Sequence, residues 1–158
     1  VYEAELNSYA PLGVEATITN TAVITANVVT PITVRETINA EEQSLLTITK
    51  SVSPVPVTEN GTLTYTFVIQ NLGNTAATEE TGVVITDTFN PVLKNLTATF
   101  NGTAWTEGAD YTYDEITGMF ASVAGKITVP AATYTQDTTT GAWGINPGVS
   151  TLVISGTV

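Results

Sequence analysis

Alternation of apolar and polar side chains is the main pattern along this chain, and its longest run lies near the start. One side chain in two is apolar over roughly 13 residues, which is the period of a half-buried strand. The pattern predicts a strand over residues 14–29 that is roughly 40 Å long, at about 3.3 Å per residue. Its apolar face is interrupted once by a polar residue and consists of Ala16, Ile18, Asn20, Ala22, Ile24, Ala26 and Val28.

The alternation weakens after Pro31 and gives way to a polar run at 39–43, which is typical of a linker. This division predicts an N-terminal arm at 1–44, made of the strand and the linker, and a body at 45–158. The first strand of the body is expected at 45–50, and the prolines that follow it suit an edge strand. The strongest strand of the body is predicted at 62–71, with inward-facing Leu63, Tyr65, Phe67 and Ile69.

Turn signals divide the rest of the body into short strands. The Asn101-Gly102 pair predicts a type I′ turn in a hairpin. A strand is expected at 83–88, and the last strand, at 150–158, carries Leu152 and Ile154 on one face. Shorter strands are predicted at 111–113, 119–120, 126–129 and 132–135. Many short strands with turns every 8 to 12 residues or so are typical of a β-sandwich, so we expect an all-β fold.

Composition supports this fold and narrows the function. The chain has 158 residues, of which 32 are threonine and most aliphatic residues are valine or isoleucine, a β-forming composition. The formal net charge is −11, which argues against a nucleic-acid partner and against binding to an anionic membrane surface. No apolar run reaches the roughly 18 to 20 residues of a membrane span.

The chain contains no histidine and no cysteine. This composition excludes zinc sites with those ligands, cysteine nucleophiles, disulfides and serine–histidine triads. We therefore expect no enzymatic activity and no cofactor. The first residue is Val1 rather than methionine, which suggests an exported protein whose signal peptide has been removed.

Ten residues between 50 and 91 form an ordered signature: Lys50, Pro54, Gly61, Leu63, Tyr65, Asn71, Gly73, Asp87, Thr88 and Pro91. On these residues the segment from about 45 to 158 resembles the conserved repeat domain of prokaryotic surface proteins, domain of unknown function family eleven, in a clostridial or bacillar-like branch. The resemblance implies an Ig-like sandwich, found in tandem in cell-wall proteins, surface layers and spore appendages. It implies an extracellular location and no catalysis.

One departure from that family suggests how the chain assembles. Members usually end with a further strand that reads like TNTATV, whereas here a similar segment, Ile18 to Thr25, lies at the N-terminus. This strand is expected either to fold back into its own body or to complete the sandwich of a neighbouring subunit, with residues 28–44 crossing between them. A third possibility is a piece of a tandem array.

The intermolecular form predicts a donor strand and a head-to-tail homopolymer, that is, the structural subunit of a pilus-like fibre or spore appendage. The self-closed form predicts a monomeric surface adhesin or carbohydrate-binding module. For the second, Trp105 and Trp143 could supply an aromatic platform, although core packing is the commoner role of such residues.

Two sets of polar residues are candidates for site chemistry. Surface domains of the Cna type join a lysine to an asparagine beside an acid, and Lys50, Asn20 and Asp87 fit that order. The alternative is that Asp87 caps a turn, Asn20 binds backbone and Lys50 is solvated. The acidic residues Asp110, Asp114 and Glu115 could bind calcium, although they lack the spacing of an EF-hand and are more typical of a solvated loop.

Overall fold

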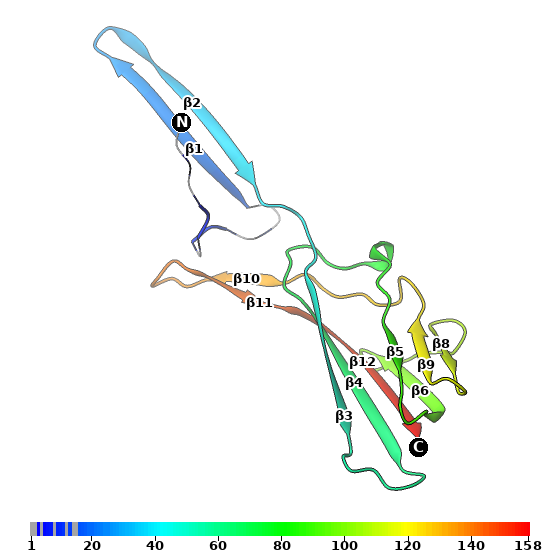
Figure 1. Cartoon of the computed structure of the whole chain (residues 1–158). Helices are drawn as coiled ribbons and strands as arrows, with labels where there is room; N and C mark the ends of the chain where they lie inside the picture. Colours follow the sequence, from blue (N-terminus) through cyan, green and yellow to red (C-terminus); the bar gives the residue numbers. More distant parts are fainter. Residues whose placement is uncertain (1–2, 4, 8, 12, 14–15) are drawn as a thin grey trace.

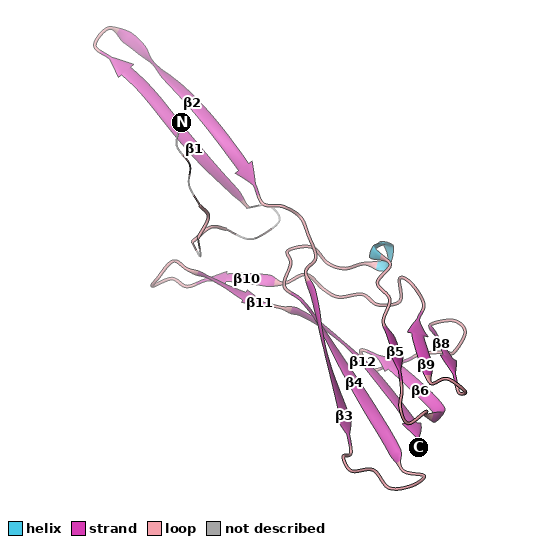
Figure 2. Cartoon of the chain, in the orientation of Figure 1, coloured by secondary structure: helices cyan, strands magenta, loops and turns pink. Residues whose placement is uncertain are grey.

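The structure is a computed structural model that describes residues 3, 5–7, 9–11, 13 and 16–158. In this part of the chain it is all-β apart from a single 3₁₀ turn, η1, at Glu79–Thr81. A long hairpin projects from a body of packed sheets (Figures 1 and 2). Across the described ranges, no helix has the length and apolar character needed to cross a membrane.

The projecting hairpin is formed by β1 (Thr17–Ala26) and β2 (Val29–Asn39), which pair antiparallel from Thr17 opposite Asn39. The strand predicted at 14–29 therefore ends early, because residues 27–28 form the turn. Val28, assigned to the apolar face, is fully exposed there. Residues 14 and 15 lie outside the described residues.

The segment after this turn also differs from the sequence expectation. Residues 28–44 are expected from the sequence as a linker that either crosses between subunits or loops back, whereas 29–39 form β2. The weak alternation after Pro31 is the reason, because it gives β2 an apolar row that faces the same side as that of β1. Only residues 40–45 connect the hairpin to the body, and this segment is called the connector below.

The body contains a sheet of five strands in the order β3-β4-β12-β6-β7. Their bounds are Leu46–Ser53, Thr62–Asn71, Gly148–Thr157, Lys94–Phe100 and Thr103–Ala104. A second sheet has the order β5-β9-β8, with bounds Thr86–Thr88, Met119–Ser122 and Tyr111–Asp114. A two-stranded ribbon, β10 (Thr133–Gln136) with β11 (Trp143–Asn146), extends sideways from the body (Figure 1).

The core lies between the five-stranded and three-stranded sheets. The predicted inward face of β4 is confirmed, since the four apolar residues on it are buried. Leu152 and Ile154 of β12 are fully buried on the same side, and Phe89 and Phe120 reach them from the second sheet. Two sheets enclosing one core make this body consistent with a β-sandwich.

Several local predictions are confirmed and others are wrong. Asn101 and Gly102 both have positive φ, at 48° and 80°, in the turn between β6 and β7, as a type I′ turn requires. The strand expected at 83–88 is shorter, because only 86–88 pair as a strand. The strand expected at 126–129 is absent from the described ladders, apart from one bridge from Val129 to Ala77. The strand β11 was not predicted.

Candidate assembly site

The inner face of β3 is the most unusual surface of the body. Residues of β3 that face inward pair with buried residues of β4, Ile48 with Ile69 and Val52 with Tyr65. In a closed sandwich they would be covered by the opposite sheet. However, Ile48 is 51% exposed and Val52 39% exposed. The three-stranded sheet therefore does not extend over β3.

Where the opposite sheet does not cover β3, a groove lies between β3 and the segment that leads into β5. Its volume is about 320 Å³, and its walls are mainly aliphatic. We call it the β3–β5 groove, and its lining residues are Leu46, Thr47, Ile48, Ile69, Val83, Val84, Ile85 and Thr86. An exposed apolar groove of this kind is a usual feature of sites that bind another chain.

Both sheets present an open edge to this groove. β3 ends the order of the five-stranded sheet, and β5 ends that of the other sheet, among the strands that the structure describes. Main-chain bonds join Ile85 to Ser122 and Phe89 to Gly118 on the β9 side. Because main-chain groups alternate along a strand, those of Thr86 and the carbonyl of Thr88 point toward the open edge, while the N–H of Thr88 is bonded to the side chain of Asp87. Such an edge can accept a further strand.

An ion pair lies where the groove continues along the two strands. The Nζ of Lys50, on β3, contacts the Oδ2 of Asp87, on β5. The other carboxylate oxygen of Asp87 accepts the backbone N–H of Thr88 at 2.9 Å. The lysine side chain is 40% exposed and that of the aspartate 18%. Lys50 and Asp87, which are 37 residues apart in the sequence and were predicted to share a site, are therefore in contact in the structure.

Aromatic rings surround the lysine amine. Its Nζ lies 4.7 Å from the ring centre of Tyr65, 5.5 Å from that of Phe67 and 5.2 Å from that of Phe89. Attraction between a cation and ring faces, together with Asp87, fixes the amine in this position. The Lys50 amine therefore contacts Asp87 and the aromatic rings, while the side chain remains 40% exposed to solvent.

The hairpin carries a second uncovered apolar surface. Directly opposed residues of an antiparallel pair project on the same side, so both strands contribute to one face. This face, called the hairpin apolar face below, carries Ile24, which is 67% exposed, and Val34, which is 59% exposed. Its cross-strand pairs are Ile18–Ile38, Asn20–Glu36, Ala22–Val34 and Ile24–Ile32.

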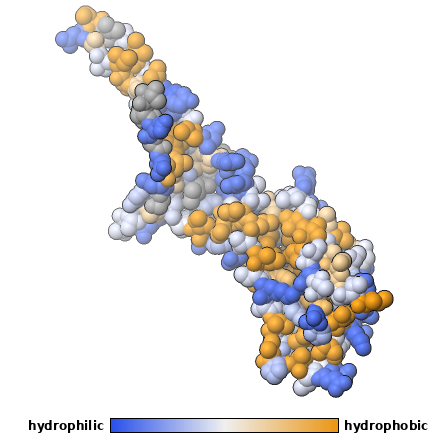
Figure 3. Space-filling model, in the orientation of Figure 1, coloured by the Kyte–Doolittle hydropathy of each residue, from blue (hydrophilic) through white to orange (hydrophobic). Residues whose placement is uncertain are grey.

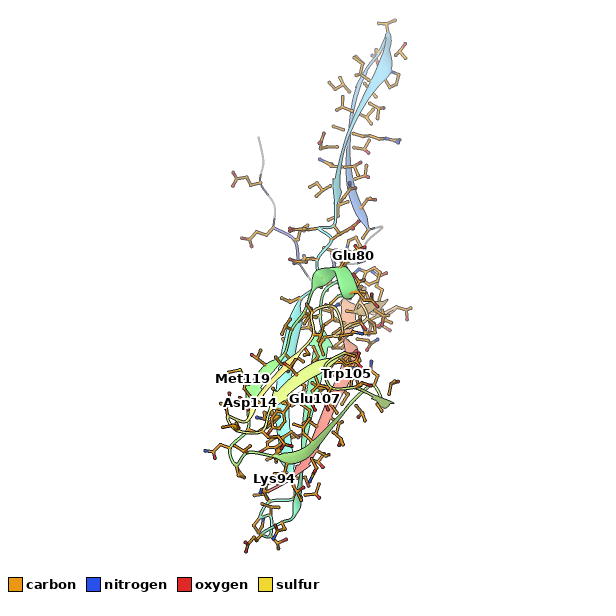
Figure 4. The ribbon with its side chains drawn as sticks, turned by 90° about the vertical axis from the view of Figure 1, so that its right-hand side faces the viewer. Glu80, Lys94, Trp105, Glu107, Asp114 and Met119 are labelled. Atoms are coloured by element: carbon orange, nitrogen blue, oxygen red, sulfur yellow. The ribbon has the colours of Figure 1, made fainter. Side chains whose placement is uncertain are left out.

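The opposite face of the hairpin is polar, with Thr19 and Thr37 in hydrogen-bond contact at 3.1 Å. Figure 4 shows the side chains of both strands extending away from the ribbon, clear of the body. In the space-filling view, apolar patches follow the hairpin and continue on the body (Figure 3). Within the described residues, β1 and β2 form a sheet with no third strand. The strand predicted as a donor is thus outside its own body.

The connector is fastened to the body by two asparagines. Asn71 accepts the N–H of Leu45 at 2.9 Å, and Asn74 accepts the N–H of Gln43 at 3.0 Å and donates to the carbonyl of Glu41 at 2.8 Å. A side chain at Gly73 would place its Cβ 2.1 Å from the carbonyl oxygen of Gln43, which only glycine avoids. These contacts fix how the hairpin leaves the body.

Of the three residues grouped for a lysine–asparagine bond, Asn20 lies apart from the other two. Asn20 lies in β1, opposite Glu36, while Lys50 and Asp87 lie in the body. Within one chain β1 lies in the projecting hairpin, apart from β3 and β5 of the body (Figure 1). Asn20 therefore does not meet Lys50 in the folded chain.

The three candidate calcium ligands make separate contacts with the chain itself. Asp110 accepts the N–H of Thr106 and pairs with Lys126 at 2.9 Å, and both contacts lower its pKa. Asp114 accepts the N–H of Ile116 and the hydroxyl of Thr117, which lowers its pKa.

Glu115, the remaining candidate, accepts the N–H of Asn95 at 3.2 Å. In Figure 4, Asp114 lies beside its strand partner Met119 on one side of the body. In the described part of the chain, no three acidic residues are grouped closely enough to hold a metal ion. These carboxylates accept hydrogen bonds within the chain and stabilise its turns.

The aromatic residues do not form a flat exposed platform in the body. Trp105 stacks on Phe100 with ring centres 5.3 Å apart, and it packs against the core. Trp143 lies half-buried in β11, on the sideways ribbon. The two tryptophans therefore belong to different parts of the molecule.

The residues that sequence reasoning missed are those that line the groove and those that β2 adds to the hairpin apolar face. Val84, Ile85 and Ile48 were assigned to strands, but nothing in their spacing indicated that they would border an open groove. The signal for β2 was present as the alternation of Ile32, Val34 and Ile38. In comparisons with models of protein families, with curated proteins and with solved structures, no match to this chain was found.

Proposed function

We propose that this protein is the structural subunit of an extracellular filament, a pilus-like fibre or spore appendage, in which the N-terminal hairpin of one subunit completes the Ig-like sandwich of the next. The observation that carries the proposal is a pair of matching uncovered surfaces in one chain. The inner face of β3 is exposed beside the open edge of β5, and the hairpin apolar face projects away from the body.

The two surfaces are chemically alike and lie apart within one chain, whose connector is bonded to the body at Gln43 and Leu45. Docking into a neighbour would cover both and would extend the β5 edge with main-chain hydrogen bonds, as in strand addition. Each subunit would donate one hairpin and accept one, so the contact is head-to-tail and repeats without closing. An extracellular location agrees with the resemblance to surface-protein repeats.

Charges placed on the two surfaces test the proposal. Ile24→Asp should abolish fibres because docking would bury an unpaired charge, a cost of several kcal/mol, or at least about 100-fold in affinity. Ile48→Asp should do the same from the groove side. The matched controls are Val23→Asp and Thr49→Asp, which place the same charge on the outward faces of β1 and β3.

Mixing the two defective variants gives the sharper measurement. The intact hairpin of Ile48→Asp should enter the intact groove of Ile24→Asp, so the mixture should form dimers and stop. Negative-stain microscopy and light scattering would follow fibres and dimers. Monodisperse wild-type monomers under all conditions would instead favour a self-closed adhesin or carbohydrate-binding module. Fibres that tolerate both substitutions would show that these two surfaces do not form the contact between subunits.

We also propose that docking joins Lys50 to Asn20 of the neighbour by an amide bond. The incoming hairpin would remove water from the Lys50–Asp87 pair, and low polarity favours the neutral forms of both groups. A proton moves from the ammonium to the carboxylate, and the free amine attacks Cγ of Asn20. The bond from Cγ to Nδ2 breaks, and this nitrogen leaves as ammonia with a proton relayed by Asp87.

Boiling the fibres in detergent tests the covalent step separately from assembly. Wild-type fibres should leave a ladder of linked subunits, with the loss of one ammonia per bond by mass spectrometry. Lys50→Arg keeps the charge beside Asp87 but lacks the nucleophilic amine, so its fibres should dissolve to monomers. Wild-type fibres that dissolve completely would show assembly without the bond.

A further inference from the structure

We propose, on the basis of the function proposed above, that the donated element is the whole β1–β2 hairpin rather than β1 alone. The hairpin is the unit that the chain already forms, with eight residue pairs in continuous register from Thr17–Asn39 to Ile24–Ile32 and a ninth, Ala26–Val29, beyond an irregularity. Donation of β1 alone would require all of these pairs to separate before a new ladder forms.

The distribution of apolar side chains favours the paired element. Ile32, Val34 and Ile38 are each more than half exposed, and all three lie on β2. If β1 entered the groove alone, these residues would remain in water as part of a linker. Docking of both strands covers the whole hairpin apolar face and breaks none of its main-chain bonds.

The numbers of strands in the two sheets also fit a two-stranded donor. The second sheet has three strands, and the sheet it faces has five. β1 pairs with β2 along one edge only, so its other edge can pair with β5 of the neighbour. The result is the order β2-β1-β5-β9-β8 in one sheet, which gives five strands facing five and a cover for β3.

The polar positions of the two surfaces define how they align. The hairpin apolar face is interrupted by one cross-strand pair, Asn20 with Glu36. The inner row of β3 is likewise interrupted once, by Lys50, which contacts Asp87. Placing one interruption on the other sets the isoleucines of the hairpin against aliphatic residues and keeps Asn20 and Glu36 beside the polar Lys50–Asp87 pair. Any shifted register would place a carboxylate against aliphatic side chains, which is costly.

A disulfide across the hairpin tests whether its strands must separate. The chain has no cysteine of its own, so Thr19→Cys/Thr37→Cys can form only the intended bond within a chain. These side chains touch on the polar face, away from the groove. The oxidised double variant should form fibres as extensively as the wild type. Fibres that appear only after reduction would overturn the proposal and favour donation of β1 alone.

The control for this experiment is Thr19→Ser/Thr37→Ser, which keeps two hydroxyls on the polar face without a lock. Thiol titration and mass spectrometry of the purified monomer would verify that the disulfide is complete. If neither the wild type nor the reduced double variant forms fibres, the proposed function itself has failed, and this result is distinct from a failure of the hairpin alone.

A charge on β2 gives a second measurement that does not depend on the disulfide. Val34→Asp should reduce fibre formation at least about tenfold, because β2 is buried in the groove of the neighbour. Thr33→Asp is the matched control on the polar face and should assemble normally. Equal assembly of both variants, with intact circular dichroism, would place β2 in solvent and overturn the proposal.

Discussion

At the scale of single residues, Asn71 connects the projecting hairpin to the body. Its side chain is fully buried at the end of β4. It accepts the N–H groups of Leu45 and Gly73 and donates to the carbonyls of Thr75 and Pro130. One amide thus holds together the connector, the loop after β4 and the segment that leads to β10.

Asn71→Ala should lower the free energy of unfolding by about 2–4 kcal/mol, because it leaves buried donors and acceptors without partners. The midpoint of urea unfolding should fall while the slope stays the same. Asn71→Asp keeps the acceptor for Leu45 but sets a buried carboxylate oxygen against the carbonyls of Thr75 and Pro130, so it should destabilise the body at least as much as alanine does. A change below about 0.5 kcal/mol for the alanine variant would show that water replaces the amide.

Residue types predicted the polar pair of the candidate site, but not the aromatic rings around it or the groove beside it. Lys50 and Asp87 were grouped from their order along the chain and lie in contact. The three aromatic rings around the amine were assigned to the core or left unassigned, because spacing says which face a residue is on but not which neighbours meet there. The exposure of Ile48 and Val52 also could not be read from the sequence, since a strand at an open edge has the same alternation as one in a closed sheet.

At the scale of elements, alternation predicted where strands lie better than it predicted their partners. β4 and β12 have a strict period of two with bulky apolar residues, and both were located correctly. The partner of β1 was missed because period-two patterns do not specify which edge a strand joins. β11 has only four residues, of which Gly144 is one, so its pattern was too weak to detect.

The division between hairpin and body predicts that the body folds without the hairpin. All core residues lie at 46 or beyond, so removal of residues 1–39 leaves the core intact. The shortened chain should unfold cooperatively, with a free energy of unfolding within about 1 kcal/mol of the full chain. Urea unfolding followed by tryptophan fluorescence would measure it. It should also form no fibres on its own.

The position of the deletion matters, because a shorter deletion that ends at Val29 would leave β2 without its partner. An isolated apolar strand is prone to pair with other chains. Aggregation of that variant would then be unrelated to normal assembly. Loss of cooperative unfolding in the chain that begins at Ala40 would contradict the division and would mean that the hairpin supports the core.

At the scale of the whole molecule, the negative charge of the chain makes its copies repel one another, while its two uncovered apolar surfaces favour one specific contact between them. The net charge of −11 opposes random association, while the groove and the hairpin apolar face supply a specific contact. The sequence predicted the all-β architecture because composition and periodicity agree on it. The length of the exposed hairpin and the direction in which it leaves the body come from hydrogen bonds of the connector that no local pattern encodes.

The short connector has a mechanical consequence for a fibre built from these subunits. Tension entering a subunit through its hairpin would reach Leu46, at the start of β3, after only the six residues of the connector. It would leave through the neighbouring hairpin held against the same strand. The load would then run along the first half of β3, where the ladder to β4 is stressed lengthwise and its bonds share the force. An amide bond at Lys50 would end that path within five residues, so most of each body would stay unloaded while the fibre is stretched.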